Sequence, residues 1–398
     1  MNPPQPERRR GPPIDLNDDV LGEIFLCIPP DDPAALARLS AVCSQWRRLL
    51  TDPDFLRSYR VLHGSPPILG FFCESLDQER VDYKWMVRSG FVPTTAFRPI
   101  VPSHFVDWLP CDCRHGRALF ITRDSQSSEL LLSFQSTTGR MPKQILVSDP
   151  MTGAEKLLDV PEMWSYMHWS AAVFCAVGGC NHLNCHGGPF RVALVCSDSR
   201  KRKPTIAAVY SSETDAWSDP TYIGLPNFFV MLRRRSVLVG NALYFHCGWN
   251  SVLEFDMARM RLAAITLPPF DDYVHWCSTC LVTAEGGGLG FAAMDMEGQS
   301  RVHLWSKEES TDRWSLSAVK DLETLLPRDA ISPMIKLIGF AEGVRVIVVR
   351  TCAGIFTVEL GSSERAKVVT MRGEIHAAFP FMSFCTPDHS RDRLPPAE

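Results

Sequence analysis

A short segment in the middle of the chain concentrates side chains that bind transition metals. Cys175, Cys180, His182, Cys185 and His186 lie within about a dozen residues of one another. Tetrahedral zinc requires a closed shell of thiolate and imidazole ligands, which this segment can supply. The spacing matches none of the usual zinc-finger patterns, however, and Cys175 lies in an apolar run typical of a buried strand. We therefore predict buried thiols without a bound metal, and zinc binding stays open as the alternative.

The other cysteines give weaker signals for chemistry. Cys111 and Cys113 flank Asp112 and precede His115, which is a less convincing set of metal ligands. The chain has 14 cysteines, and its first residues contain no apolar stretch of the kind that directs secretion. We therefore expect reduced thiols rather than disulfides, and a cytoplasmic or nuclear location.

Motifs of the common enzyme classes are absent from the sequence. We find no GxSxG nucleophile turn, no GxxxxGK[ST] phosphate-binding loop and no HExxH metalloprotease helix. No pair of side chains suggests general acid and base catalysis. We predict a protein that is not an enzyme and that uses no cofactor.

Charge and composition exclude further classes of protein. The chain has 398 residues, with 41 Lys and Arg against 45 Asp and Glu, which gives a net charge of −4. Binding to nucleic-acid backbones or to anionic membranes would need an excess of positive charge, so neither partner is expected. The longest apolar stretch, from Ala171 to Cys180, is about half the roughly 20 residues of a membrane-spanning helix. The whole sequence is 45% hydrophobic, which is typical of a folded globular chain.

Residues 14–60 have the periodicity of short helices. The first predicted helix follows Asn17, a good N-cap, and has one apolar face: Val20, Leu21, Ile24, Phe25 and Ile28. Pro29 and Pro30 end this helix, and Asp32 with Pro33 starts a second one. A third predicted helix spans the region of Val42 to Leu50. Helices of this length are marginal in water, so they need a packing surface from another protein or from the rest of the chain.

From about Gly64 onward, short apolar runs alternate with Gly, Pro, Asp and Ser turns, which indicates strands. Two patterns recur along this half. The first is a glycine that precedes an apolar strand: Gly116, Gly188, Gly240, Gly288 and Gly343. The second is a strand that ends in a polar turn, beginning at Val147, Val209, Leu253, Leu304 and Phe356. A repeat of about 45–50 residues made only of strands is typical of β-propeller blades.

The sequence therefore predicts a multidomain protein, with a small three-helix module followed by a β-propeller over residues 64–386. Six blades fit the repeats best, and seven remain an alternative because the interval from Gly116 to Gly188 is long. A degenerate blade is expected to begin near Gly70, and the apolar stretch from Ala377 to Cys385 is expected to close the ring onto it. Residues 1–13 and 387–398 are predicted to be disordered tails.

Loops on one rim of a propeller commonly bind partners, and Trp, Tyr and Arg contribute most at such interfaces. Three segments supply aromatic candidates for contact with a target protein: Trp164, Tyr166 and Trp169; Trp249; and Tyr273, His275 and Trp276. The alternative is that these side chains pack between blades, as large aromatics usually do.

Two basic runs also lie in this half. Arg200 to Lys203 is predicted to be a solvated loop between strands, with a nuclear localisation signal or phosphate patch as the alternative. Arg233 to Arg235 is predicted to be exposed, with contact to an acidic target on the propeller rim as the alternative.

The helical region resembles the F-box family. The likeness rests on Ile14 to Phe25, on the Val42-Cys43 and Trp46-Arg47 pairs, and on Pro53-Asp54-Phe55. It departs from the family pattern where Leu16 is followed by Asn17 rather than by proline. The remaining chain is similar to the β-propeller regions attached to F-boxes in large plant families, notably at Asp112 to Arg117, Ser148 to Gly153 and Tyr210 to Trp217.

This resemblance implies the substrate-recognition subunit of a SKP–cullin–F-box E3 ubiquitin ligase. The helical module would dock on the Skp-family adaptor, and through it on a cullin–RING ligase, while the propeller would bind a target protein. Residue matching to the family gives an adaptor-facing and supporting apolar set: Leu16, Leu21, Ile24, Leu36, Leu39, Val42 and Trp46. The alternatives are a non-degradative F-box scaffold and a propeller sensor that is gated by a ligand or a metal.

Overall fold

The structure is a computed structural model that describes residues 16–387 apart from several internal segments. The segments outside the description are 82–83, 123–141, 162–167, 199–202, 225–229, 232–233, 249, 269–278, 296–299, 309–312, 332–334, 363–365 and 371–373. The chain divides into two compact units, a helical unit of Met1–Gly64 with Cys385–Glu398 and a β unit of Ser65–Phe384. Each unit is described by itself.

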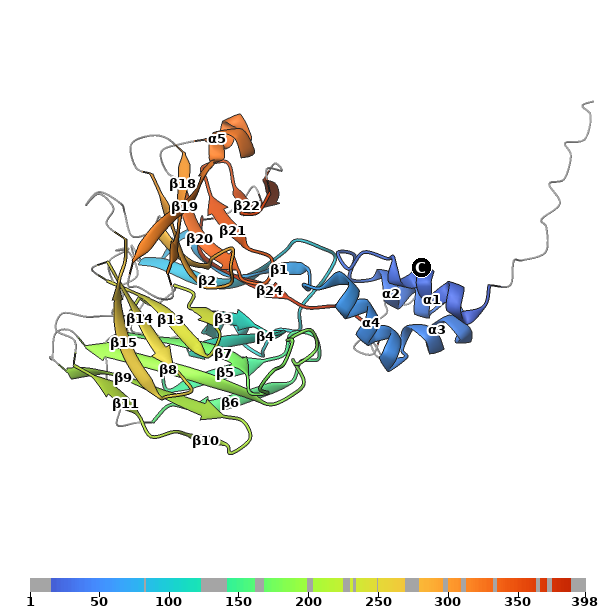
Figure 1. Ribbon diagram of the computed structural model, residues 1–398, viewed down its shortest axis with the longest axis horizontal. Helices are drawn as coiled ribbons and strands as arrows, with labels where there is room; N and C mark the ends of the chain where they lie inside the picture. The colour runs from blue at the N-terminus through green and yellow to red at the C-terminus, as the bar shows by residue number, and fades with distance from the viewer. Residues whose placement is uncertain are drawn as a thin grey trace, which may run out of the picture. The chain divides into compact units, whose positions relative to one another are not determined.

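Four helices form the helical unit (Figure 1). They are α1 (Asp18–Leu26), α2 (Ala35–Ser40), α3 (Ser44–Leu50) and α4 (Pro53–His63). The side chain of Asn17 caps α1 by accepting a 2.9 Å hydrogen bond from the amide of Val20. The three-helix prediction was one helix short. The fourth helix is α4, which Asp52 caps and Pro53 starts and which continues for 11 residues to His63.

The helices are held together by one small apolar core. Its fully buried members are Leu21, Phe25, Leu36, Leu50, Leu56 and Tyr59. Phe25 of α1 also meets Trp46 of α3 edge to face, with 5.0 Å between the ring centroids. The hydroxyl of Tyr59 donates a 2.9 Å hydrogen bond to the carbonyl of Ile28. The end of the described chain also belongs to this unit, because the Arg60 guanidinium donates to the Thr386 hydroxyl at 3.0 Å.

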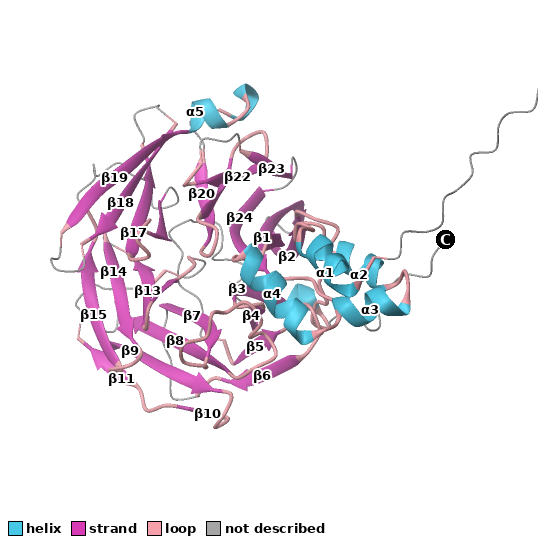
Figure 2. Cartoon of the chain, turned by 45° about the vertical axis from the view of Figure 1, so that its right-hand side comes forward, coloured by secondary structure: helices cyan, strands magenta, loops and turns pink. Residues whose placement is uncertain are grey.

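The β unit is a six-bladed propeller, counted over the described residues (Figure 2). The first blade is a three-stranded sheet in the order β2 (Lys84–Pro93), β1 (Ile68–Val81) and β24 (Glu374–Met382). The second comprises β3 (Trp108–Arg114), β4 (Arg117–Thr122), β5 (Gln144–Ser148) and β6 (Glu155–Asp159). The third comprises β7 (His168–Cys175), β8 (Phe190–Asp198), β9 (Lys203–Ser211), β10 (Ala216–Trp217) and β11 (Thr221–Ile223).

The remaining blades each have four antiparallel strands. The fourth contains β12 (Val237–Val239), β13 (Ala242–Cys247), β14 (Ser251–Asp256) and β15 (Arg261–Thr266). The fifth contains β16 (Thr279–Thr283), β17 (Leu289–Met294), β18 (Arg301–Lys307) and β19 (Trp314–Asp321). The sixth contains β20 (Lys336–Ala341), β21 (Val346–Arg350), β22 (Ile355–Glu359) and β23 (Lys367–Thr370). Short helical turns at η1 (Phe105–Asp107), α5 (Leu322–Leu325) and η4 (Arg328–Ala330) join the blades.

The two sequence patterns mark fixed places within a blade. The glycine pattern lies at the hairpin between the first and second strands, and Gly116 and Gly240 take positive φ angles there, which glycine adopts without a steric penalty. The second pattern marks the third strand and the turn that follows it. The long interval from Gly116 to Gly188 contains β4, β5 and β6 of the second blade and β7 of the third. Six blades are thus confirmed.

The ring closes as the sequence predicted, because β24 pairs antiparallel with β1. Gly70 differs from the other pattern glycines, since it lies within β1 and not in a hairpin. It faces Pro93 of β2 on one side and Phe381 of β24 on the other. The reason is that the first strand of this blade comes from the carboxyl end of the chain, so the blade has no hairpin at the place where the pattern would fall.

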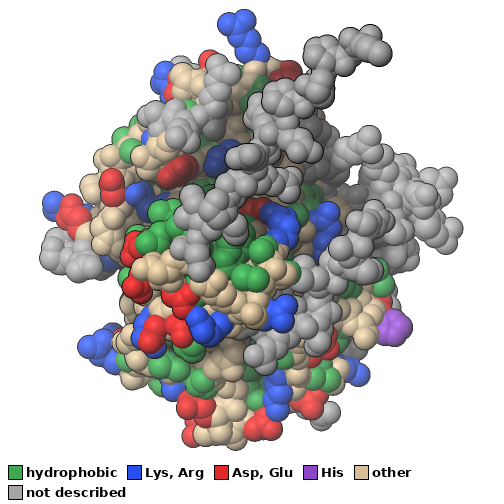
Figure 3. Space-filling model, turned by 90° about the vertical axis from the view of Figure 1, so that its right-hand side faces the viewer, with side chains coloured by type: hydrophobic (Ala, Val, Ile, Leu, Met, Phe, Trp, Pro, Cys, Tyr) green, Lys and Arg blue, Asp and Glu red, His purple; other side chains and the backbone are tan. Residues whose placement is uncertain are grey.

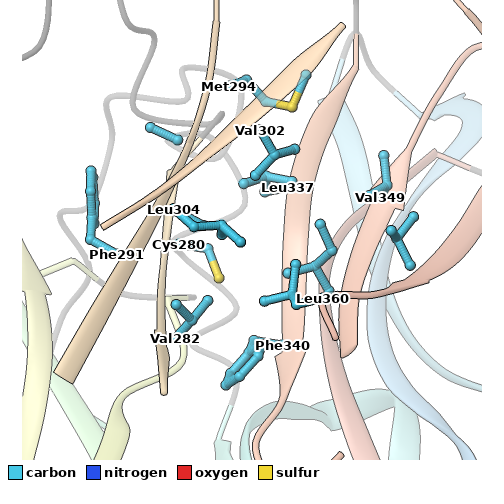
Figure 4. Close-up of a cluster of buried hydrophobic side chains, with 14 of the residues drawn as sticks. Cys280, Val282, Phe291, Met294, Val302, Leu304, Leu337, Phe340, Val349 and Leu360 are labelled. Carbon is cyan, nitrogen blue, oxygen red and sulfur yellow. The ribbon is translucent and has the colours of Figure 1, made fainter. Parts of the chain in front are cut away.

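Neighbouring blades share interdigitated apolar cores. Figure 4 shows one of them, where side chains of the fifth and sixth blades fill the space between the sheets. The fifth blade contributes Cys280, Val282, Phe291, Met294, Val302 and Leu304, and the sixth contributes Leu337, Phe340, Val349 and Leu360. Burial on both faces explains why these strands read as nearly continuous apolar runs instead of strict alternation.

One buried titratable side chain makes the stability of the propeller dependent on pH. His246 in β13 is buried, and its Nε2 lies 3.0 Å from the hydroxyl of Thr279 in the fifth blade. Burial, with a smaller contribution from the charge of Arg234, lowers the pKa of His246 to about 3, against an ordinary 6.5. The unfolded chain therefore binds one more proton than the folded chain between these two pH values. This contribution to stability is complete above pH 6.5 and is lost as the pH falls toward 3.

We expect the substitution His246→Gln to remove this pH dependence. Acidification from about pH 7 to about pH 5 should cost the natural protein roughly 2 kcal/mol more of its unfolding free energy than it costs the variant. Urea unfolding of both proteins at the two pH values measures the difference, and effects of other histidines cancel in it. Parallel pH curves for the two proteins would contradict the prediction.

Candidate functional site

The helical unit exposes apolar side chains even though its own core is complete. Val20 and Ile24, one turn apart on α1, are 44% and 49% exposed, and Val42 in the turn between α2 and α3 is 62% exposed. Exposed valine and isoleucine on a folded helical unit mark a surface available to a partner. In Figure 3, apolar side chains lie between acidic and basic ones on the face of the molecule turned to the viewer. We call Val20, Ile24 and Val42 the exposed apolar set.

The predicted adaptor-binding residues divide into three groups in the structure. Leu21 and Leu36 are buried in the core of the helical unit, so they support the fold. Leu16, Leu39 and Trp46 are half-buried. Ile24 and Val42 are exposed. Val20 lies on the predicted apolar face of the first helix but is not in the predicted adaptor-binding set, and its exposure beside Ile24 adds it as a candidate contact.

A polar link between α1 and α3 fixes the angle at which the exposed apolar set is presented. The amide of Gln45 donates a 2.8 Å hydrogen bond to Asp18, and Arg48 forms an ion pair with the same carboxylate. The hydrogen bond from Gln45 and the charge of Arg48 together lower the pKa of Asp18. The pairing joins residues 27 to 30 positions apart, which no local pattern in the sequence indicates.

Of the aromatic candidates for target binding, only Trp169 lies within the described residues. Trp169 lies in β7, is 3% exposed and packs in the apolar cluster between the second and third blades, so its predicted role as a target contact is wrong. The physical reason is the one weighed as the alternative, because a large aromatic ring on an inner strand fills the space between sheets. Trp164, Tyr166, Trp249, Tyr273, His275 and Trp276 lie outside the described residues.

The second basic run is also not where the sequence placed it. Arg234 and Arg235 turn inward, and the prediction of an exposed run is wrong for both; Arg233 lies outside the description. Arg234 donates to the carbonyl of Thr279 at 2.8 Å, and Arg235 donates to the carbonyls of Cys113 and Phe340. In the first run, Lys203 is the first residue of β9 and not part of a loop, and residues 200–202 are outside the description.

Arg235 belongs to a buried ionic network on the first strands of the blades. Arg114 in β3 forms ion pairs with Asp112 in the same strand and with Glu342, which follows β20. It also donates to the hydroxyl and the carbonyl of Ser236. Asp112 in turn accepts a 3.0 Å hydrogen bond from the amide of Val173 in β7. The network therefore connects the second, third, fourth and sixth blades, and each charge in it has an opposite partner.

The neighbours of Arg114 and Glu342 favour the charged form of both side chains. Burial alone would lower the pKa of Arg114, but the carboxylates of Asp112 and Glu342 outweigh it and raise that pKa. Burial would likewise raise the pKa of Glu342, whereas Arg114 and Arg235 lower it. Arg114, Asp112 and Glu342 therefore form a buried ion cluster within the propeller.

The candidate metal ligands come together in the structure. One ligand atom from each of Cys175, Cys180, His182 and Cys185 lies within 4.8 Å of every other, although the sequence analysis regarded Cys175 as a core residue. Cys175 is both a core residue and a candidate ligand, because it is buried and is the last residue of β7, next to the loop with the other ligands. His186 is not part of the group, since its Nδ1 lies 2.8 Å from the carboxylate of Asp149.

Comparisons with known proteins agree with the helical part of this description. A model of the F-box domain matches residues 14–58. No curated protein matches the chain. Among the described residues, no helix combines the length and the apolar character needed to cross a membrane.

Solved structures of low similarity overlap the chain. A periplasmic gluconolactonase of Pseudomonas aeruginosa is 11% identical with a TM-score of 0.40, over 77% of this chain and 83% of its own. A protein from Lactobacillus plantarum is 6% identical with the same score and coverage. BamB of Moraxella catarrhalis is 11% identical with a TM-score of 0.29, over 67% of this chain and 74% of its own. At these scores the likenesses support no inference about this protein.

Proposed function

Because the chain has an F-box domain at residues 14–58 and a six-bladed β-propeller after it, we propose that it is the substrate-recognition subunit of a SKP–cullin–F-box ubiquitin ligase. In this proposal the helical unit binds the Skp-family adaptor and the propeller binds a target protein. The adaptor joins the receptor to a cullin–RING ligase.

The observation that supports adaptor binding is the exposed apolar set on a helical unit with a complete core. Val20, Ile24 and Val42 leave apolar surface in water that the described residues do not cover. A partner that buries this surface gains roughly 25 cal/mol for each Å² of apolar area removed from water. The pairing of Gln45 and Arg48 with Asp18 holds α1 and α3 in one arrangement before the partner arrives, which reduces the entropy lost on binding.

The proposed mechanism needs no catalytic side chain in this protein. A receptor that holds a target lysine near a ubiquitin-loaded conjugating enzyme converts an encounter between separate molecules into a reaction within one complex. The gain in rate comes from the raised effective concentration of the target lysine at the conjugating enzyme. The buried ionic network fits this role, because its ion pairs tie together the blades that present the target-binding loops.

The free cysteines support a reducing compartment for this activity. All the described cysteines are free in the structure, including the exposed Cys27, Cys43 and Cys352. Exposed free thiols are typical of proteins of the cytoplasm and the nucleus. We place the protein in one or both of these compartments.

Introducing negative charge into the exposed apolar set tests adaptor binding. We expect Ile24→Glu combined with Val42→Glu to weaken the affinity for the Skp-family adaptor at least about 100-fold, because two apolar contacts would be replaced by desolvated carboxylates. Isothermal titration calorimetry with the purified adaptor measures the affinity. The substitutions lie at exposed positions, so the thermal unfolding of the variant should match that of the natural protein.

The matched control is Leu316→Glu, which places the same charge on an exposed apolar position of β19 in the propeller. This control should bind the adaptor with unchanged affinity. Equal adaptor binding by the double variant and the control would overturn the proposed docking surface. A reconstituted ubiquitination assay with co-purified partners then separates a receptor from a scaffold, since only a receptor yields a partner modified with ubiquitin chains in an adaptor-dependent way.

A further inference from the structure

The connection between β7 and β8 gathers three thiols and an imidazole around one point. Their ligand atoms lie within 4.8 Å of one another, and the Sγ of Cys185 is 3.7 Å from the Nδ1 of His182. In a tetrahedral zinc site with Zn–S bonds of about 2.3 Å, neighbouring ligand atoms are roughly 3.8 Å apart. The observed group is thus within about an ångström of that arrangement. We propose that Cys175, Cys180, His182 and Cys185 bind one zinc ion in a closed structural site.

The length of this connection supports the proposal. In the second blade, His115 and Gly116 alone join the first two strands, and in the fourth blade Gly240 and Asn241 do so. In the third blade the same hairpin extends over residues 176–189 and contains neither helix nor strand. A long irregular loop on a compact domain requires its own stabilising contacts. Zinc would provide them at the one blade whose inner hairpin is extended in this way.

The interior of the loop consists of ligand atoms rather than hydrocarbon. Cys185 is buried and Cys180 and His182 are half-buried, whereas Val177 is exposed. Leu183 is the other large apolar residue of the segment, and it is half-buried. A loop with so few buried apolar side chains gains little from hydrophobic burial, so a metal would add substantially to the polar contacts that fix it.

Backbone contacts hold the ligands in place before any metal binds. The loop closes where the amide of Ala176 donates to the carbonyl of Pro189 at 3.1 Å. Arg117 donates to the carbonyls of Cys185 and Gly188 at 2.6 and 2.5 Å. The sulfur of Cys180 accepts a hydrogen bond from the amide of His182 at 3.3 Å, a contact that stabilises coordinated thiolates.

His115 of the neighbouring blade orients the imidazole ligand. Its ring stacks on that of His182, with centroids 3.8 Å apart and planes 9° apart. The amide of Cys175 donates a 3.0 Å hydrogen bond to the Nδ1 of His115, which fixes the ring. Three thiolates and one imidazole are soft ligands that favour zinc over the hard cations that prefer oxygen. With four protein ligands no position stays open, so the metal would shape the loop and would not catalyse a reaction.

Metal analysis of the purified full-length chain tests the proposal. Protein expressed with zinc in the medium and purified under reducing conditions should contain about one equivalent of zinc by mass spectrometry of the metal. Replacement of zinc by cobalt should give the absorption bands of tetrahedral cobalt with thiolate ligands. Removal of the metal with a chelator should expose the 176–189 loop to proteolysis while the propeller stays folded by circular dichroism.

Two substitutions and a control assign the metal to these residues. Cys180→Ser and His182→Asn both alter half-buried positions, and asparagine tolerates the positive φ of 58° at position 182. Each variant should lose most of its zinc while retaining the natural circular dichroism spectrum. Cys352→Ser, at an exposed free cysteine, should keep the full equivalent. Zinc far below one equivalent in the natural protein, stoichiometric iron in its place, or unchanged zinc in both variants would overturn the assignment.

Discussion

The substitution Arg114→Ala is expected to destabilise the propeller by about 3–5 kcal/mol, because it leaves two buried carboxylates with Arg235 as their remaining cationic partner. The side chains of Arg114 and Asp112 are each 1% exposed, and that of Glu342 is largely buried. Arg114 also satisfies the hydroxyl and the carbonyl of Ser236, so its loss removes contacts to two other segments, at Ser236 and at Glu342. A loss of this size is a large part of the stability of an ordinary domain. Urea unfolding followed by tryptophan fluorescence measures the change.

The matched control for this prediction is an exposed ion pair of the same residue types. Arg259 pairs with Asp256 at 2.8 Å, but the Arg259 side chain is 78% exposed. We expect Arg259→Ala to change the unfolding free energy by less than about 1 kcal/mol, since solvent screens such pairs. The double variant Arg114→Met with Glu342→Gln should recover part of the lost stability, because one buried charge is removed with its partner. Similar losses for Arg114→Ala and Arg259→Ala would show that the network does not hold the blades together.

The repeat in the sequence predicted the propeller because each blade obeys the same local rules. Glycine is needed at Gly116 and Gly240 for turns with positive φ, and the strands between such turns are apolar because both of their faces are buried. The closing strand was predictable for a similar reason, since an apolar run after the last repeat needs a partner. Gly70 did not fit the pattern because the position of a strand in a sheet depends on which end of the chain supplies it, a property that no local rule contains.

The candidate sites were harder to predict because they form between blades. Arg235 lies in a run of three arginines that looks like solvated charge, and only the fold places it against Cys113 and Phe340. The partners of Arg114 are separated from it by 2 to 228 positions in the sequence. The zinc ligands are close in sequence, but their spacing alone argued against a metal. Their convergence depends on the return of the loop to β8 and on the stacking of His115, which belongs to another blade.

The closing strand β24 offers the second test of large effect. It pairs with β1 along its length, and it also contacts β20 of the sixth blade and β3 of the second. Ala377, Ala378, Phe379 and Phe381 are buried in it. The approach to β20 is so close that a Cβ on Gly339 would lie 2.3 Å from the carbonyl oxygen of Ala378. The strand β24 therefore completes the first blade and packs against the first strands of the two blades beside it.

We expect a chain that ends at Thr370 to lose cooperative unfolding, because deletion of β24 exposes the edge of β1 and opens the cores on both sides of the first blade. A chain that ends at Pro387 keeps every described contact of β24 and should melt like the natural protein. Differential scanning calorimetry distinguishes the two. Addition of a peptide of residues 371–387 to the shorter chain should restore a cooperative transition, and the same peptide with Phe379→Ala and Phe381→Ala should not. A cooperative transition in the shorter chain alone would show that the first blade closes the ring without its terminal strand.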